Sequence, residues 1–380
     1  ANNSLTMPDY LKNRFHDEQN IIRLISAIFI LIFFLIYTSS GFVAGGKLFQ
    51  TVFGMDYFHA LLLGAGVVVI YTFLGGFSAV CWTDFFQGML VLGSMFIAPI
   101  FAAFMLDTSS MSALPGGYLN PFSSWQDIVS GLAWGLGYFG MPHIIIRFMS
   151  IKSQKDLKKS AKIGITWTLL IVFFATLIGV IGRLFLGFDE SINENSLVFI
   201  QIVRKIFPGV ISGILLSAVL AASMSTADSQ LLAASSAFSS DVYKPVIRKG
   251  KASDKEMMWT GRIVVLGISV AALIIASNPN AGSIMALVSN AWGIFGAAFG
   301  PAIMLSLFWK RFNFKGAVAG IITGAAVDIL WYAFLTSTGI YELLPGFVLG
   351  LIAAVVVTLC TNEPSKEVYE LFDKAQKFDE

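Results

Sequence analysis

The chain has 380 residues, of which 56% are hydrophobic and only 13% are charged. Its mean hydropathy is +0.76, whereas about a quarter of the residues in an ordinary soluble domain are charged. The 25 basic and 23 acidic residues nearly cancel and form no continuous basic face, which excludes nucleic acid as a partner. The two cysteines, Cys81 and Cys360, lie too far apart to suggest a disulfide framework or a metal site. We therefore predict an all-α integral membrane protein whose surroundings are the lipid bilayer.

Apolar stretches recur along the whole chain, each close to the length of about 20 residues that crosses the hydrocarbon core. No polar stretch between them is long enough to form a core of its own, so we expect one membrane domain over residues 1–380. The sequence predicts ten spans, at 21–43, 58–74, 85–106, 128–149, 161–186, 210–242, 259–276, 284–309, 316–336 and 344–361.

The distribution of basic residues tests this count, because Lys and Arg accumulate in short cytoplasmic loops. If residue 1 is placed inside the cell, almost all basic residues fall in inside loops. The outside loops then hold only Lys47, Arg183, Arg204 and Lys205. An odd number of spans would mix the two sets, so both ends of the chain are expected to be cytoplasmic.

Two of the outside loops, 45–58 and 195–209, mix apolar and polar residues at helical spacing. They are too short to span a bilayer. Helices along the membrane interface and covered loops explain this pattern equally well.

The expected fourth span is interrupted by glycine and proline, with Trp134 and Tyr138 among the glycines and Pro142 after them. A broken helix is tolerated in lipid only where it lines a cavity or packs on neighbours. Exposed helix ends beside aromatic rings suit a small polar solute near the middle of the membrane. Alternatively, Gly131 and Gly135 form a small-residue face for close helix packing. The two interpretations are equally consistent with this stretch alone.

The expected sixth span carries hydroxyl side chains on one face. Ala222, Ser225, Thr226 and Ser229 are spaced at i, i+3, i+4 and i+7. The hydroxyls and the Ala222 carbonyl offer the hard oxygen ligands that an alkali cation takes. Asp228 follows at once, and a carboxylate within a membrane is costly enough to suggest a function. The alternative is that Ser and Thr donate back to the preceding turn, and without other evidence this alternative is favoured.

Two other acids lie in expected spans. Asp84 begins the third span, where a carboxylate also serves as a helix cap. Asp328 lies in the ninth span and is expected to face a neighbouring helix. The histidines are scattered and have no partner at metal-ligand or catalytic spacing, so neither a metal site beyond sodium nor an enzyme is expected.

Five segments together resemble the sodium/solute symporter family, and most of all its sodium/proline symporters. They read NNSLTMPDYL, YTFLGGFSAVCWTD, AWGLGYFGMPHIIIRFM, SMSTADSQLLAASSAFSSDVYK and SNAWGIFGAAFGP. The resemblance implies an inverted-repeat, leucine-transporter-like fold and sodium-driven import of a small solute across a bacterial inner membrane. Proline is the favoured solute. The alternatives are pantothenate, a sugar, sialic acid, or a transporter-like sensor of a signalling protein.

The resemblance also assigns roles to residues. Sodium is the implied cofactor, and its expected ligands are the Ala222 carbonyl, Ser225 and Thr226. The residues expected to line the solute pocket and its gate are Trp134, Tyr138 and Pro142. Some relatives have a second sodium site, which would here comprise Asp84, Asp228 and Ser229. The chain departs from the proline symporters at Asp228, where they tend to have Ser.

Members of the family have thirteen helices, and the ten expected here resemble the last ten. The resemblance thus implies that three helices precede this sequence. It divides the chain into the remainder of the first repeat, the second repeat, two accessory helices and a cytoplasmic tail, at 21–106, 128–309, 316–361 and 362–380.

Overall fold

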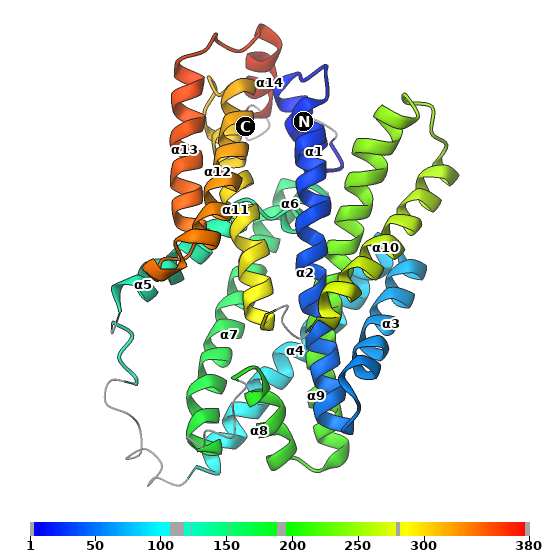
Figure 1. Ribbon diagram of the computed structural model, residues 1–380, viewed down its shortest axis with the longest axis vertical. Coiled ribbons are helices and arrows are strands. Elements are labelled where there is room, and N and C mark those ends of the chain that lie inside the picture. The colour runs from blue at the N-terminus through cyan, green and yellow to red at the C-terminus, as the bar shows by residue number, and fades with distance from the viewer. Residues whose placement is uncertain are drawn as a thin grey trace.

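All ten apolar segments are helical in the computed structural model, which describes residues 4–106, 118–122, 124–151, 153–187, 195–278 and 282–376 (Figure 1). These residues contain no β-strand. The last four residues of the expected tail, 377–380, lie outside the described part. Eight of the described helices are long and apolar enough to cross a bilayer alone. They are α2 (Ile21–Phe53), α3 (Tyr57–Gly75), α4 (Phe77–Phe104), α7 (Gln154–Leu186), α9 (Gly209–Ser236), α10 (Asp254–Ser277), α11 (Ile284–Phe308) and α12 (Phe314–Phe334).

The other two expected spans depart from a simple long helix. The fourth is broken, as its glycines and proline predicted, and bends by 46°. Its parts are α5 (Trp125–Trp134), the 3-10 helix η2 (Gly135–Phe139) and α6 (Pro142–Met149). The tenth, α13 (Leu343–Leu359), has 17 residues, the short end of the range that crosses a bilayer. A short 3-10 helix, η5 (Thr336–Thr338), lies in the connection between α12 and α13.

The first outside loop differs from its prediction. Residues 45–53 do not form a separate interfacial element, because α2 continues through them to Phe53. Gly46 lets this extended helix pack closely against α3, since a Cβ on Gly46 would lie 3.2 Å from Leu61 Cα. The second outside loop is helical, with the 3-10 helix η3 (Asn195–Leu197) followed by α8 (Val198–Ile206). The side chains of Ile200 and Val203 are buried.

The centre of the molecule is α11, which packs against α2, α12 and α13 (Figure 1). Every residue from 291 to 303 is buried, as expected for a helix covered on all sides. Small residues allow this close packing. A Cβ on Gly296 would lie 2.7 Å from Gly137 Cα of η2, and a Cβ on Gly324 of α12 would lie 2.0 Å from Ala297 O. The fold therefore holds the broken helix against a rigid support.

The helix that carries the expected sodium ligands ends in an unusual way. α9 continues into the π-helical segment η4 (Ala237–Ile247), a form that often marks functional regions. Arg23 of α2 donates to Asp241 of η4 at 2.9 Å and to Asp9 of α1 (Met7–Phe15) at 2.9 Å. This end of α9 is thus tied to α1 and α2. Figure 1 places α1 and α14 (Lys366–Gln376) at the same end of the molecule.

Candidate ion and solute site

Three oxygens of α9 gather at one point on the helix. The Ser225 and Thr226 hydroxyls both donate to the Ala222 carbonyl, at 3.2 and 3.0 Å. A hydroxyl donates one hydrogen and keeps lone pairs for other partners. The structure thus shows the back-bonding that was the alternative interpretation of the sequence, and this bonding leaves lone pairs on both hydroxyls for another partner. The bonds to Ala222 orient the hydroxyls without using up their lone pairs.

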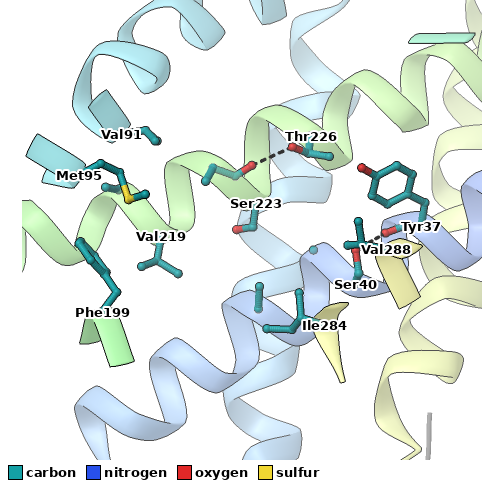
Figure 2. Close-up of a pocket in the computed structure, with 14 residues that line it drawn as sticks. Tyr37, Ser40, Val91, Met95, Phe199, Val219, Ser223, Thr226, Ile284 and Val288 are labelled. Atoms are coloured by element: carbon teal, nitrogen blue, oxygen red, sulfur yellow. Dashed lines mark hydrogen bonds between the residues drawn. The ribbon is translucent and has the colours of Figure 1, made fainter. Parts of the chain in front are cut away.

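The oxygen cluster forms part of a wall between two cavities. The first cavity has a volume of about 380 Å³ and lies between α2, α4, α8, α9 and α11. Figure 2 shows Ser223 and Thr226 of α9 near Tyr37 and Ser40 of α2, with apolar side chains around the rest. The second cavity, of about 1050 Å³, lies between α4, η2, α6, α7 and α9. Thr226 lines both, and Ser225 lines the second, so a ligand can approach the cluster from two sides.

The break in the fourth span is fixed by its packing on α11. A Cβ on Gly140 would lie 2.2 Å from Phe295 O, so no larger residue fits there without a shift of the backbone. Pro142 is the first residue of α6 and is buried. A proline is accommodated at that position because the first amide of a helix has no partner within the helix. Pro142 therefore shapes the break from within the protein.

The aromatic residues of the broken helix divide into two environments. Trp134 stacks on Trp292 of α11 with ring centroids 5.4 Å apart, and on Tyr341 at 5.7 Å. The Trp292 indole also donates to Trp134 O at 2.9 Å. Tyr138 contacts the edge of Trp292 at 4.8 Å, is 47% exposed and lines the larger cavity. The structure thus brings Tyr138 to the same cavity as Ser225 and places Trp134 behind it in an aromatic stack.

Trp292 and Tyr341 belong to this aromatic cluster but were not predicted as part of the site. Trp292 lies within SNAWGIFGAAFGP, one of the segments quoted for the family resemblance, and this was the only signal for it. Tyr341 lies in the connection before α13 and had no signal at all.

The residues of the expected second sodium site also lie together, with an arginine among them. Arg147 of α6 forms an ion pair with Asp84 of α4 and donates to Ser229 Oγ at 2.5 Å. Ser229 Oγ is 3.3 Å from Asp228 Oδ1, and Asp228 is fully buried. The positive charge expected from a second sodium is therefore already supplied by a guanidinium in this arrangement. Arg147 was interpreted from the sequence only as a basic residue of a cytoplasmic loop.

Among the described residues, no three His, Cys, Asp or Glu side chains gather as a metal site would require. His143 of α6 packs its ring against Phe34 and Tyr37 of α2. The polar groups around the two cavities include hydroxyls, the Ala222 carbonyl and the Arg147–Asp84 pair.

The fold and the site together define an ion-coupled membrane transporter: a bundle of apolar helices in which a broken helix and a hydroxyl-bearing helix share a cavity. A sequence profile of the sodium:solute symporter family matches residues 1–324. The chain belongs to this family, as the sequence motifs predicted, and it is a transporter and not an enzyme.

Its relatives include several bacterial proline transporters. The osmoregulated proline transporter OpuE of Bacillus subtilis is 43% identical over 387 residues, which cover 99% of this chain and 78% of that protein. The high-affinity proline transporter PutP of the same organism is 44% identical over 384 residues, covering 99% and 81%. A sodium/proline symporter of Staphylococcus aureus is 42% identical over 381 residues, covering 96% and 74%.

A solved structure supports the fold independently of these sequences. A sodium-coupled sialic acid symporter, solved in a substrate-bound outward-open state, superimposes with a TM-score of 0.78. The alignment covers 95% of this chain and 78% of that one at 21% identity. The prediction of a helical symporter fold is thereby confirmed.

Proposed function

We propose that this protein imports L-proline together with sodium across a bacterial plasma membrane. The proposal for proline draws on the three relatives above, whose names specify proline transport. The observation that carries the proposal for sodium is the oxygen cluster of Ala222, Ser225 and Thr226, in the wall between two cavities.

Sodium would be held by the two hydroxyls and the Ala222 carbonyl. Hard cations take oxygen ligands, and in secondary transporters such ligands come from carbonyls and hydroxyls near breaks in helices. The hydroxyls already point at one place, so binding costs little side-chain entropy. Further ligands would have to come from elements that close around the cluster.

The solute would bind in the larger cavity, next to the ion. A zwitterion such as proline has an apolar ring and two charged groups. The exposed ring of Tyr138 offers an apolar surface for the former. The buried Pro142 maintains the break before α6, which borders this cavity. Trp134 would act as a gate support, because its stack on Trp292 holds the segment that carries Tyr138.

A second sodium at Asp84, Asp228 and Ser229 is the less favoured part of the proposal. The ion pair between Arg147 and Asp84 places a positive charge where that ion would bind. We infer that transport uses one sodium per cycle as long as this ion pair is intact.

Coupling follows from linkage: if sodium favours the state that binds the solute, the solute favours sodium by the same factor. A membrane potential adds about 2.3 kcal/mol per charge per 100 mV to the inward drive.

In the proposed topology both ends of the chain are cytoplasmic, in keeping with α1 and α14 lying at one end of the molecule. The proposed division is 21–106 and 128–309 for the two repeats, with 316–361 as accessory helices and 362–380 as the tail.

The test is uptake of labelled proline by the complete gene product in proteoliposomes, with an imposed inward sodium gradient. We expect uptake that stops when potassium replaces sodium. Pantothenate, sugars and sialic acid are added as competitors, and none is expected to reduce proline uptake. Strong inhibition of proline uptake by one of these competitors would contradict the assignment of proline as the solute. Proline uptake that does not depend on sodium would contradict the ion site.

A further inference from the structure

Two buried carboxyl groups lie near each other, outside the two cavities described above. Asp328 is on α12 and is 1% exposed, and Glu342 immediately precedes α13 and is 8% exposed. Asp328 Oδ2 has no hydrogen-bond partner among the described residues. Ionised carboxyls are rare in such places because burial without a partner is costly.

Both side chains converge on Gly293 of α11. A Cβ built on Gly293 would lie 2.9 Å from Asp328 Oδ2 and 3.4 Å from Glu342 Cγ. The Tyr341 hydroxyl would lie 3.4 Å from the same point, and it donates to Ser289 O at 2.6 Å. Asp328 Oδ2 is therefore aimed at a position that the Glu342 side chain and the Tyr341 phenol also approach.

No basic group in the described part of the chain compensates this pair. The ion pairs and hydrogen bonds that the structure describes place no Lys, Arg or His on either carboxyl. The surrounding helices contribute Ser289, Trp292 and Gly293 from α11 and Gly346 from α13. The titratable groups that face the pair are thus Tyr341 and, beyond it, Tyr37 of α2.

The site is also too tightly packed for a cation with several ligands. A Cβ on Gly346 would already lie 3.1 Å from Asp328 Cβ, and neither carboxyl lines the cavities described above. Two like charges in such a place cannot both be retained cheaply, so one carboxyl keeps its proton. In agreement with this, burial raises the pKa of Glu342 above its usual value.

We propose that Asp328 and Glu342 form a proton-binding pair, in which the two carboxyls together hold one exchangeable proton at neutral pH. The proton comes from water and returns to it, with no other bond made or broken. The site is separate from the proposed sodium and solute site, and it stands whether or not that proposal holds.

The pair contacts the structure that supports the solute cavity. Tyr341 lies beside the pair and stacks on Trp134, which stacks on Trp292, and Trp292 contacts Tyr138. Loss of the proton held by the pair would place a second negative charge next to Tyr341. The protonation state of the pair is therefore expected to affect how firmly this aromatic stack is held.

Infrared difference spectroscopy of the purified, complete protein tests the proposal without any transport assay. The carbonyl stretch of a protonated carboxylic acid is followed while the pH is raised in sodium-free buffer. We expect a band at neutral pH that disappears in alkaline buffer. In D328N and in E342Q the remaining carboxyl should lose its proton at a lower pH, because its charged neighbour is gone. The D328N/E342Q double variant should lack the band.

The control is Glu256→Gln, which removes a partly exposed carboxylate paired with Arg248 and should leave the band unchanged. Three results would overturn the proposal. One is a wild-type protein without a protonated carboxyl at neutral pH. Another is a band that titrates at the same pH in wild type and single variants. The third is loss of the band on adding sodium at constant pH, which would identify a metal-cation site in its place.

Discussion

α9 and α11 are both long membrane helices rich in small residues, yet they are packed in opposite ways. In the most apolar part of α11, 78% of the residues are buried, compared with 39% for the helix formed by α9 and η4. The glycines of α11 bring other backbones into contact, whereas the hydroxyls of α9 face cavities. Small residues therefore build a rigid support in one helix and leave room for a ligand in the other.

Gly140→Ala is expected to have the largest effect on stability, because it disrupts the contact of the broken helix with α11. The added methyl group would overlap Phe295 O, and overpacking of this kind typically costs about 1–3 kcal/mol or more. The measurement is the folded yield and the thermal unfolding midpoint in detergent. Gly131→Ala is the matched control, since a Cβ there meets nothing within 4 Å. Equal stability of the two variants would contradict the role of α11 as a rigid support.

Replacement of Ser225 and Thr226 by Ala should leave stability nearly unchanged and weaken sodium binding. Loss of two ligands is expected to raise the sodium concentration for half-maximal uptake at least tenfold, about 1.4 kcal/mol. Solute affinity at saturating sodium should change much less. Ser217→Ala is the control, because Ser217 makes the same back-bond, to Gly213 O at 2.8 Å, and lies outside both cavities. A similar shift in that variant would mean that the hydroxyls serve only the helix.

Arg147→Ala tests whether an arginine closes the second cation position. Removal of the guanidinium frees Asp84 and Ser229, so uptake should depend more steeply on sodium, as expected for a second bound ion. Arg147→Lys retains the charge and should keep the single-ion dependence. If both variants keep the wild-type steepness, Arg147 does not decide the number of ions.

Lys310→Ala should have the smallest effect. Lys310 joins Asp373 of α14 at 2.7 Å, and both side chains are 46% exposed. Exposed ion pairs contribute at most about 1 kcal/mol. Thermal unfolding should shift only slightly, and proline uptake should not change. A marked loss of uptake would show that the attachment of α14 matters for transport.

The spans and the break in the fourth span could be predicted because hydropathy, glycine and proline act locally. The extent of α2 beyond residue 43 could not, since contacts with another helix, such as that of Gly46 with Leu61, leave no local pattern in the sequence. The hydroxyl cluster was visible as a helical spacing. The partner of Arg147 could not be predicted, because the charge rule uses a basic residue near a span end only to assign sidedness, whereas Arg147 also pairs with a carboxylate on α4. Its contact with Asp84 joins segments that no local pattern links.

The most direct test of the central claim is the binding of radioactive sodium to the complete gene product in detergent, without any gradient or solute flux. We predict saturable binding that is weakened at least tenfold in the Ser225→Ala/Thr226→Ala variant and is unchanged in Ser217→Ala. Equal sodium affinity in the wild-type protein and the double variant would contradict the assignment of the ion to α9.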